Sequence, residues 1–201
     1  MSADLRKEKN ILRAEFKLRR AEIAKKNKQE LDRDISAEIC ALACFRFADT
    51  VLLYSPIGSE IDLSAVAYEA LSKGKRVAFP VCNTDDCTLT FRYVSALCEL
   101  EDGSYSIKEP SADAEQFGNE ENSVCIVPAL SFDRCGFRIG YGKGYYDRFL
   151  KAFRGTAIGA VYSELLCDSL PRGFYDLAVD VIVTERGSII TDAGKEKIGK
   201  R

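Results

Sequence analysis

Short apolar runs alternate with helical patterns along most of this chain of 201 residues. Residues 124–127 (Val-Cys-Ile-Val), for example, end at Pro128, as expected of a buried strand. Such alternation favours an α/β fold, because each helix carries the chain back to begin another parallel strand. We therefore predict a mostly parallel sheet flanked by helices on both faces, a three-layer α/β/α domain with N-terminal helices.

Periodicity, proline and glycine indicate where the elements begin and end. Leu12, Phe16 and Ile23 recur at helical spacing in the first part of the chain. The predicted helices cover residues 3–26, 29–44, 63–72, 145–153 and 164–168. The predicted strands cover residues 50–54, 76–79, 89–94, 124–127, 157–161 and 179–184. Pro80 is expected to end the second strand, and residues 99–122 to form a long polar loop.

Two unusual segments follow predicted strands. Residues 55–60 come after the first strand, and residues 131–144 come after the strand that ends at residue 127. Ligands of parallel α/β sheets bind outside the carboxyl ends of the strands. We therefore expect both segments to line one cleft.

The composition limits the class of protein. A hydrophobic content of 46% suits one domain, expected at residues 1–190 and followed by a polar C-terminal tail at 191–201 that is expected to fray. The net charge of −2 provides no field for nucleic acid, and no apolar run approaches the length of a membrane span. The N-terminus is charged rather than signal-like. We expect a cytoplasmic monomer that binds neither nucleic acid nor membrane.

The chain contains eight cysteines and no histidine. The cysteines are scattered without a Cys-x-x-Cys pair, which indicates free thiols in a reducing compartment. The lack of histidine excludes Ser-His-Asp and Cys-His catalysis, histidine general bases and histidine metal sites. Any chemistry must come from carboxylates, lysine, arginine, tyrosine, a metal ion or the substrate. Phosphoryl transfer meets this limit, because it depends on positioning and charge neutralisation.

Residues 132–148 carry the strongest candidate site. The glycines of this segment are Gly140, Gly142 and Gly144, and its cations are Arg138, Lys143 and Arg148. Alternating glycines bring backbone N–H groups close to a ligand, and the helix predicted from residue 145 favours anions at its start. The pattern indicates a polyphosphate site with Asp147 as a possible metal ligand. It matches neither the P-loop nor the dinucleotide motif, so a glycine-rich turn without a ligand is an equal alternative.

Six segments, in order along nearly the whole chain, resemble the 5-formyltetrahydrofolate cyclo-ligase family. They are Lys-Asn-Ile-Leu-Arg at 9–13, Ser-Glu-Ile-Asp-Leu at 59–63, Ile-Lys-Glu-Pro at 107–110, Val-Pro-Ala-Leu-Ser-Phe-Asp at 127–133, the glycine loop at 138–148 and Asp-Leu-Ala-Val-Asp at 176–180. The resemblance implies ATP- and Mg²⁺-dependent closure of 5-formyltetrahydrofolate to 5,10-methenyltetrahydrofolate, with release of ADP and phosphate. The implied route is a phosphorylated formyl group attacked by N10, and the implied partners are a reduced folate and ATP.

The resemblance also implies roles for individual residues. ATP would be bound by Lys9, Arg13, Arg138, Gly140, Gly142, Lys143, Gly144, Tyr145 and Tyr146, with Lys143 and Arg138 also catalytic. The folate would be bound by Glu60, Tyr105, Tyr141 and Tyr145, and Mg²⁺ by Asp147 and Asp176. Spacing alone allows plainer roles, since Lys9 and Arg13 share a face typical of solvated charge and Tyr146 could be a core residue.

One position departs from the family pattern. The second aspartate is commonly preceded by histidine, and this chain has Tyr175 there. The departure puts in question the packing role that the histidine would have, and it leaves the carboxylate of Asp176 in place. Two other functions remain as alternatives: a small-molecule kinase on the same scaffold, which would release a phosphorylated product, and a non-catalytic folate- or nucleotide-binding protein. Whether residues 99–122 close over the substrate is open at this stage.

Overall fold

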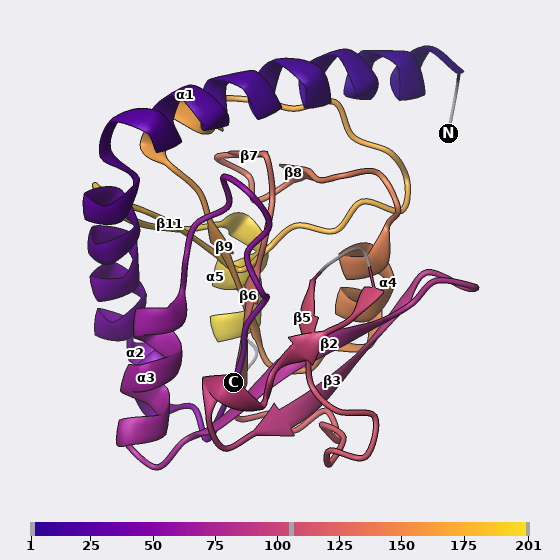
Figure 1. The fold of residues 1–201 in the computed structure, drawn as a ribbon. Helices are drawn as coiled ribbons and strands as arrows, with labels where there is room; N and C mark the ends of the chain where they lie inside the picture. The colour runs from indigo at the N-terminus through magenta and orange to yellow at the C-terminus, as the bar shows by residue number, and fades with distance from the viewer. Residues whose placement is uncertain (1–2, 105–106, 200–201) are drawn as a thin grey trace.

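A seven-stranded sheet lies at the centre of the computed structural model, which describes residues 3–104 and 107–199 (Figure 1). Its strand order is β12-β11-β9-β6-β1-β2-β3. The strands are β1 (Thr50–Leu52), β2 (Arg76–Asn83), β3 (Thr88–Val94), β6 (Ser123–Val127), β9 (Thr156–Ala160), β11 (Val181–Thr184) and β12 (Gly187–Ile190). The five inner strands pair in parallel, and β3 and β12 are antiparallel edges. The predicted mostly parallel α/β sheet is confirmed.

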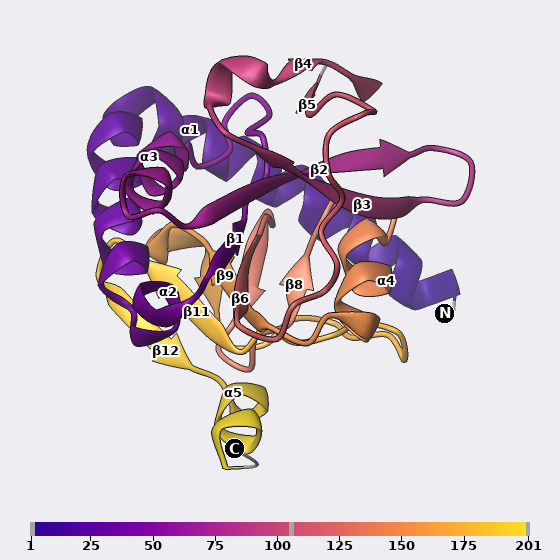
Figure 2. The same ribbon diagram turned by 90° about the horizontal axis from the view of Figure 1, so that it is seen from below.

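Helices cover both faces of this sheet, as predicted (Figure 2). The covering helices are α1 (Ala3–Ala41), α2 (Ala43–Phe47), α3 (Ser64–Ser72) and α4 (Tyr145–Ala152), whereas α5 (Asp192–Ile198) projects away from the sheet (Figure 2). The second half of α1 lies with α2 and α3 on one side, and α4 packs on the other (Figure 2). None of the helices within the described ranges is both long and apolar enough to span a membrane.

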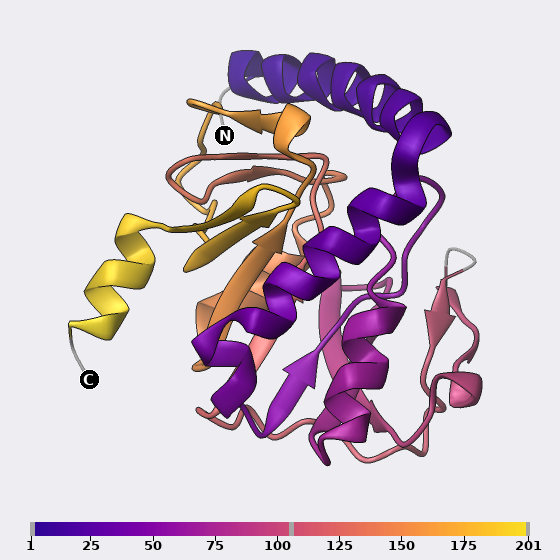
Figure 3. The same ribbon diagram turned by 90° about the vertical axis from the view of Figure 1, so that its left-hand side faces the viewer.

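A kink divides α1 into two arms. Asn27 has non-helical dihedral angles, with φ −138° and ψ 26°, so the predicted helix at 3–26 and most of the one at 29–44 form one bent element that ends at Ala41. Figure 3 shows the first arm crossing above the sheet and the second arm descending along α3. The first arm therefore lies where it can cover the segments that leave the strands.

The core is built from the central strands. Val51, Ile126, Ile158 and Ile182 are fully buried and come from β1, β6, β9 and β11. All residues of β1, β6 and β11 are buried, as expected of parallel strands covered on both faces. The sheet is therefore a rigid platform for the loops at its ends.

Short elements occupy several segments expected to be loops. A three-stranded sheet joins β10 (Leu166–Cys167), β7 (Ser131–Asp133) and β8 (Arg138–Ile139). A two-stranded pair, β4 (Glu101–Asp102) with β5 (Lys108–Glu109), lies in the predicted polar loop, after the 3₁₀ turn η1 (Leu97–Glu99). The helix predicted at 164–168 is not formed: its place is taken by the 3₁₀ turn η3 (Ser163–Leu165) and by β10.

Pro80 does not end the second strand, contrary to the prediction. It lies within β2 opposite Phe91 of β3, beyond Ala78, the last residue that pairs with β1. The carbonyl of Phe91 accepts from the Phe117 N–H at 2.9 Å, on the side away from β2. The pair of Pro80 and Phe91 is thus of the non-hydrogen-bonded kind, where a missing N–H costs nothing.

The expectation of a frayed tail is wrong for residues 192–198, which form α5. The buried Thr191 caps this helix, because its Oγ1 accepts from the Gly194 N–H at 3.2 Å. Lys197 anchors the other end through an ion pair with Asp180 at 2.9 Å. The single-domain extent of residues 1–190 stays a prediction.

Candidate active site

The glycine loop is presented by the β7–β8 hairpin. The buried carboxylate of Asp133 shapes this hairpin, since its Oδ1 accepts from the N–H groups of Cys135 and Phe137 at 3.0 Å each. Gly136 has φ +93°, and a Cβ there would lie 2.6 Å from the carbonyl oxygen of Val179. Only glycine fits this turn, so the entry to the loop is closely defined.

The first arm of α1 lies directly against the loop. The Nε of Arg13 donates to the carbonyl of Gly140 at 2.8 Å. A Cβ on Gly142, which has φ +96°, would lie 3.0 Å from the guanidinium carbon of Arg13. Gly144, in the left-handed region at φ +75°, starts α4. The loop thus lies between a cationic helix face and a helix N-terminus, an arrangement that favours phosphate.

Two cation–carboxylate pairs flank the loop. Lys9 on α1 pairs with Asp176, 167 residues away in the sequence. Arg138 on β8 pairs with Asp147 on α4, with 2.7 Å between Nη2 and Oδ1. The backbone of Leu177 joins the pairs, since its carbonyl accepts from Arg138 at 2.9 Å and its N–H donates to Asp147 at 3.2 Å. The two predicted metal ligands are therefore held in adjoining positions.

The free cation of the site is Lys143. Its side chain is exposed and has no ion-pair or hydrogen-bond partner among the described residues. Its carbonyl oxygen accepts from Nη1 of Arg148 at 2.8 Å, and the same nitrogen donates to the Cys87 carbonyl at 3.2 Å. Arg13 is partly buried, which lowers the pKa of its guanidinium against the opposing effect of Asp176. Lys143 is therefore available to a ligand, whereas Arg148 is occupied with the backbone.

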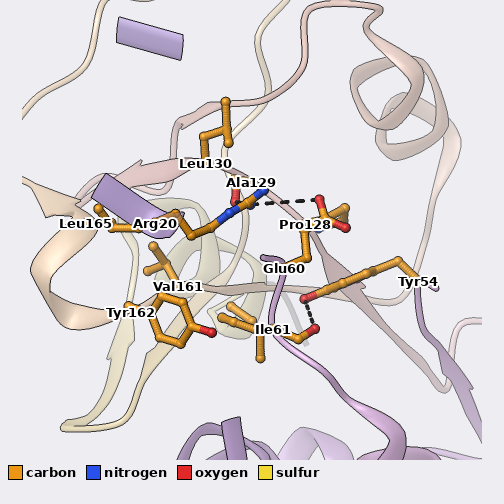
Figure 4. Close-up of a pocket in the computed structure, with 11 residues that line it drawn as sticks. Arg20, Tyr54, Glu60, Ile61, Pro128, Ala129, Leu130, Val161, Tyr162 and Leu165 are labelled. Atoms are coloured by element: carbon orange, nitrogen blue, oxygen red, sulfur yellow. Dashed lines mark hydrogen bonds and ion pairs between the residues drawn. The ribbon is translucent and has the colours of Figure 1, made fainter. Parts of the chain in front are cut away.

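A pocket lies at the carboxyl ends of β1, β6 and β9 (Figure 4). Its lining includes Tyr54 after β1, Pro128 after β6 and Tyr162 after β9, together with Glu60 and Arg20. Glu60 is only 3% exposed, and its Oε2 accepts from the Ile57 N–H at 2.8 Å. A pocket is thus present at the strand ends, with Glu60 of the segment 55–60 in its lining, but no residue of 131–144 lines it, so a single cleft shared by both segments stays a prediction.

Burial raises the pKa of Glu60 above the ordinary value for glutamate. The Ile57 N–H and the nearby charge of Arg20 act in the opposite direction. Nη1 of Arg20 lies 3.9 Å from Oε1 of Glu60. A buried carboxylate beside a single guanidinium is suited to bind a ligand that offers N–H donors.

Arg20 is the functional residue that sequence reasoning missed. Its side chain is almost fully buried, and Nη2 donates to the hydroxyl of Tyr141 at 2.6 Å. The signal was present, because Lys9, Arg13, Phe16 and Arg20 recur every three to four residues along one face of α1. Phe16 is 2% exposed, which marks this face as the buried one.

The remaining predicted residues divide into three groups. Tyr145 and Tyr146 begin α4 beside the loop, and the Tyr146 hydroxyl is buried without a hydrogen-bond partner in the described part of the chain. Tyr105 lies outside the described residues. Tyr175 is 78% exposed and contacts Phe174 edge to face at 5.3 Å, so it does not take a packing role here. The exposure of Tyr175 does not change the position of Asp176, which pairs with Lys9.

The residues present fit a magnesium ion. Asp147 and Asp176 supply two carboxylates beside the glycine loop, the number that Mg²⁺ typically takes from a protein. Within residues 3–104 and 107–199 no cluster of three or more carboxylate or thiol side chains forms a closed metal site. This donor set suits a metal that shares its coordination with water and phosphate rather than a structural ion.

A mostly parallel sheet with a pocket at the carboxyl ends of its strands is typical of α/β enzymes, and a cationic glycine loop before a helix is typical of phosphate binding. A sequence model described as the 5-formyltetrahydrofolate cyclo-ligase family matches residues 5–185, and the chain belongs to this family. It is an ATP-dependent ligase of folate one-carbon metabolism that converts 5-formyltetrahydrofolate to 5,10-methenyltetrahydrofolate.

Individual relatives agree with this assignment. The chain is 34% identical over 149 residues to the 5-formyltetrahydrofolate cyclo-ligase of Mycolicibacterium smegmatis, covering 70% of this chain and 76% of the relative. It is 26% identical over 171 residues to that of Escherichia coli K12, covering 83% and 94%. The solved structure of Aquifex aeolicus 5,10-methenyltetrahydrofolate synthetase superposes with a TM-score of 0.80 at 32% identity, covering 92% and 93%.

Proposed function

We propose that the γ-phosphoryl group of ATP is transferred to the formyl oxygen of 5-formyltetrahydrofolate in the site described above. N10 then attacks the formyl carbon, the bond from that carbon to the phosphorylated oxygen breaks, and inorganic phosphate leaves with the electron pair. N10 gives up its proton, and the five-membered ring is closed. The substrate supplies the nucleophile, so a chain without histidine can perform the reaction.

One observation carries this proposal. Tyr141 belongs to the glycine loop, and its hydroxyl is bonded to Arg20, which lines the pocket that contains Glu60. The phosphate loop and the carboxylate pocket are therefore neighbours joined by a direct contact. Such proximity is what transfer between a nucleotide and a folate requires, since the reacting atoms have to meet within about 3–3.5 Å.

Cations of the loop would hold the polyphosphate. Lys9, Arg13 and Arg138 are anchored by carboxylates or the loop backbone, and the exposed Lys143 is free to follow the transferred group. The N–H groups from Gly140 to Tyr146 would supplement these charges at the start of α4. Lys143 and Arg138 would neutralise the charge that develops on the transferred phosphoryl group.

Asp147 and Asp176 would hold Mg²⁺. The ion, when bound, neutralises phosphate charge and orients its oxygens. The carboxylates now face Arg138 and Lys9, which are also the proposed phosphate ligands. Binding of ATP with the metal would let each cation turn to a phosphate and each carboxylate to the metal, so that no charge in the site loses a partner.

The folate ring system would bind at this end of the sheet, beside Glu60. An ionised Glu60 can accept two N–H bonds from the pterin. Tyr141, which is bonded to Arg20, and Tyr145, at the start of α4, would border the ring on the loop side. A role for Tyr105 in stacking is kept as a proposal from sequence. We further propose that the protein is a monomer and that it lies in the cytoplasm. The eight cysteines, which are all free, support the reducing compartment.

The decisive experiment follows the near-ultraviolet absorbance of the purified protein with 5-formyltetrahydrofolate, Mg²⁺ and ATP. We expect an ATP-dependent rise from the methenyl product, matched mole for mole by released phosphate. A stable phosphorylated folate without phosphate release would instead identify a kinase. Size-exclusion chromatography with light scattering measures the molar mass in solution and so tests the proposed monomeric state.

A further inference from the structure

Arg20 connects three separate segments of the site. Its Nη2 donates to the Tyr141 hydroxyl at 2.6 Å, in the glycine loop. Its Nη1 donates to the Ala129 carbonyl at 3.0 Å, after β6, and its Nε donates to Ser59 Oγ at 3.1 Å, next to Glu60. Three donors in fixed fork geometry therefore connect the glycine loop, the end of β6 and the loop that carries Glu60 to one residue of α1.

The same guanidinium is the main positive charge at Glu60. The titratable groups that face this carboxylate are Arg20 and Lys28 from α1, Tyr54 after β1, Tyr141 from the glycine loop and Tyr146 from α4. Lys28 is committed to Asp32 through an ion pair. Removing the Arg20 charge would thus leave Glu60 buried among neutral phenols, where the protonated form is favoured.

We infer that Arg20 is a positioning residue that clamps Glu60 and Tyr141 to each other, so that the folate pocket and the glycine loop move as one unit. The inference rests on the proposed binding of the pterin by Glu60. Arg20 has two separable tasks in this arrangement. Its charge keeps Glu60 ionised as an acceptor, and its fork fixes the Tyr141 hydroxyl.

The first test compares Arg20→Gln with Arg19→Gln. Arg19 lies on the preceding position and is exposed; it contacts the Glu164 carbonyl, Glu15 and the ring of Phe16, and none of the groups that Arg20 holds. We expect Arg20→Gln to raise the KM for 5-formyltetrahydrofolate about tenfold or more, with a much smaller change in the KM for ATP. Arg19→Gln should leave both KM values near those of the unmodified protein. Equal effects of the two substitutions would overturn the inference.

The pH profile separates positioning from a general loss of structure. In Arg20→Gln a larger share of Glu60 is protonated as pH falls, because its pKa rises further. The KM for the folate should therefore climb as the pH is lowered, and it should climb at a higher pH in Arg20→Gln than in the unmodified protein. Arg20→Lys keeps the charge and should restore the flatter profile. A pH dependence that is the same in all three proteins would contradict the role of the charge.

A double-mutant cycle tests the fork. Tyr141→Phe removes the hydroxyl that Arg20 holds and that also interacts with Glu60, so its effect on the folate KM should be larger in the unmodified protein than in Arg20→Gln. The effect should likewise be smaller in Arg20→Lys, which lacks the fork. Additive effects would refute a clamp. If Arg20→Gln does not fold, as judged by circular dichroism, the same cycle is measured with Arg20→Lys, Tyr141→Phe and the variant that combines them.

Glu60→Gln distinguishes this inference from the function on which it rests. A normal folate KM in Glu60→Gln would mean that the proposed pterin contact is wrong. A raised folate KM in Glu60→Gln together with a normal one in Arg20→Gln would leave the proposed function standing and overturn the role of Arg20.

Discussion

Arg13 and Gly140 are joined by a hydrogen bond of 2.8 Å between the guanidinium Nε and the carbonyl oxygen, across 127 residues of sequence. This bond holds the first arm of α1 on the glycine loop. The site is therefore shared between the N-terminal helix and the sheet, and each half positions the other. Removal of contacts between the helix and the loop should weaken the binding of ATP more than it lowers the stability of the fold.

Replacement of Arg13 by alanine should raise the KM for ATP about tenfold or more, because a charged phosphate ligand and the Gly140 bond are lost together. Steady-state kinetics with ATP varied at saturating folate measures the effect. Lys7→Ala, on an exposed position of the same helix, is the matched control. Indistinguishable KM values for the two variants would refute the role of Arg13.

Lys143→Ala should lower kcat by about 10²-fold or more if the ammonium group neutralises charge in the transition state. The exposed side chain makes no contact that the fold needs, so thermal unfolding should not change. Lys151→Ala, farther along α4 and also exposed, serves as control. A folded Lys143→Ala variant with near-normal turnover would exclude the assignment.

Asp147→Asn should raise the Mg²⁺ concentration needed for half-maximal activity sharply, since a neutral amide is a poor magnesium ligand. Arg138 would also lose its partner at 2.7 Å, so folding is checked by circular dichroism. Asp168→Asn removes a fully exposed carboxylate paired only with Arg134 and should leave the titration unchanged. An unaltered magnesium titration in Asp147→Asn would count against a metal role.

Gly136→Ala should reduce the free energy of unfolding by about 3 kcal/mol, from the strained positive φ and the collision with the Val179 carbonyl. Gly58→Ala is a control with φ +58° and open space around the new methyl group, for which only about 1 kcal/mol is expected. Urea denaturation of both variants separates conformational strain from the collision. Equal losses would show that the hairpin relaxes around the methyl group.

Alkylation should discriminate among the cysteines. Burial raises the pKa of Cys40 to about 11, and burial together with Glu109 raises that of Cys82 to about 12. At about pH 8 their reactive thiolate is scarce, so iodoacetamide should label the exposed Cys98 first. Peptide mass mapping at short reaction times checks the order, and labelling in denaturant shows that every thiol is competent. Early labelling of Cys82 would contradict its burial.

Much of the fold was accessible from local pattern. The strand predicted at 124–127 is Ser123–Val127, and the helix predicted at 145–153 is Tyr145–Ala152. Both are short segments whose apolar spacing and flanking proline or glycine leave little choice. The antiparallel strand β12 was missed, since Gly187–Ile190 is only half-buried and lacks a buried-strand pattern.

The errors came from interactions outside the local window. Pro80 reads as a strand terminator, and only the register with Phe91 shows that its nitrogen has no ladder bond to lose. The tail after residue 190 reads as polar, and only the buried Thr191 and the pair of Lys197 with Asp180 make it a helix. Local propensity is a weak guide where tertiary contacts compensate for it.

The sequence by itself determined which chemical groups this protein has: a glycine loop with cations and a carboxylate, and no histidine, which excludes histidine-based catalysis. The tertiary structure alone decided which charges meet. Lys9 reaches Asp176, and Arg20 reaches Tyr141 and Glu60, because the kink at Asn27 lays one arm of α1 over the strand ends. Such contacts depend on how distant segments pack, which no spacing along the chain records.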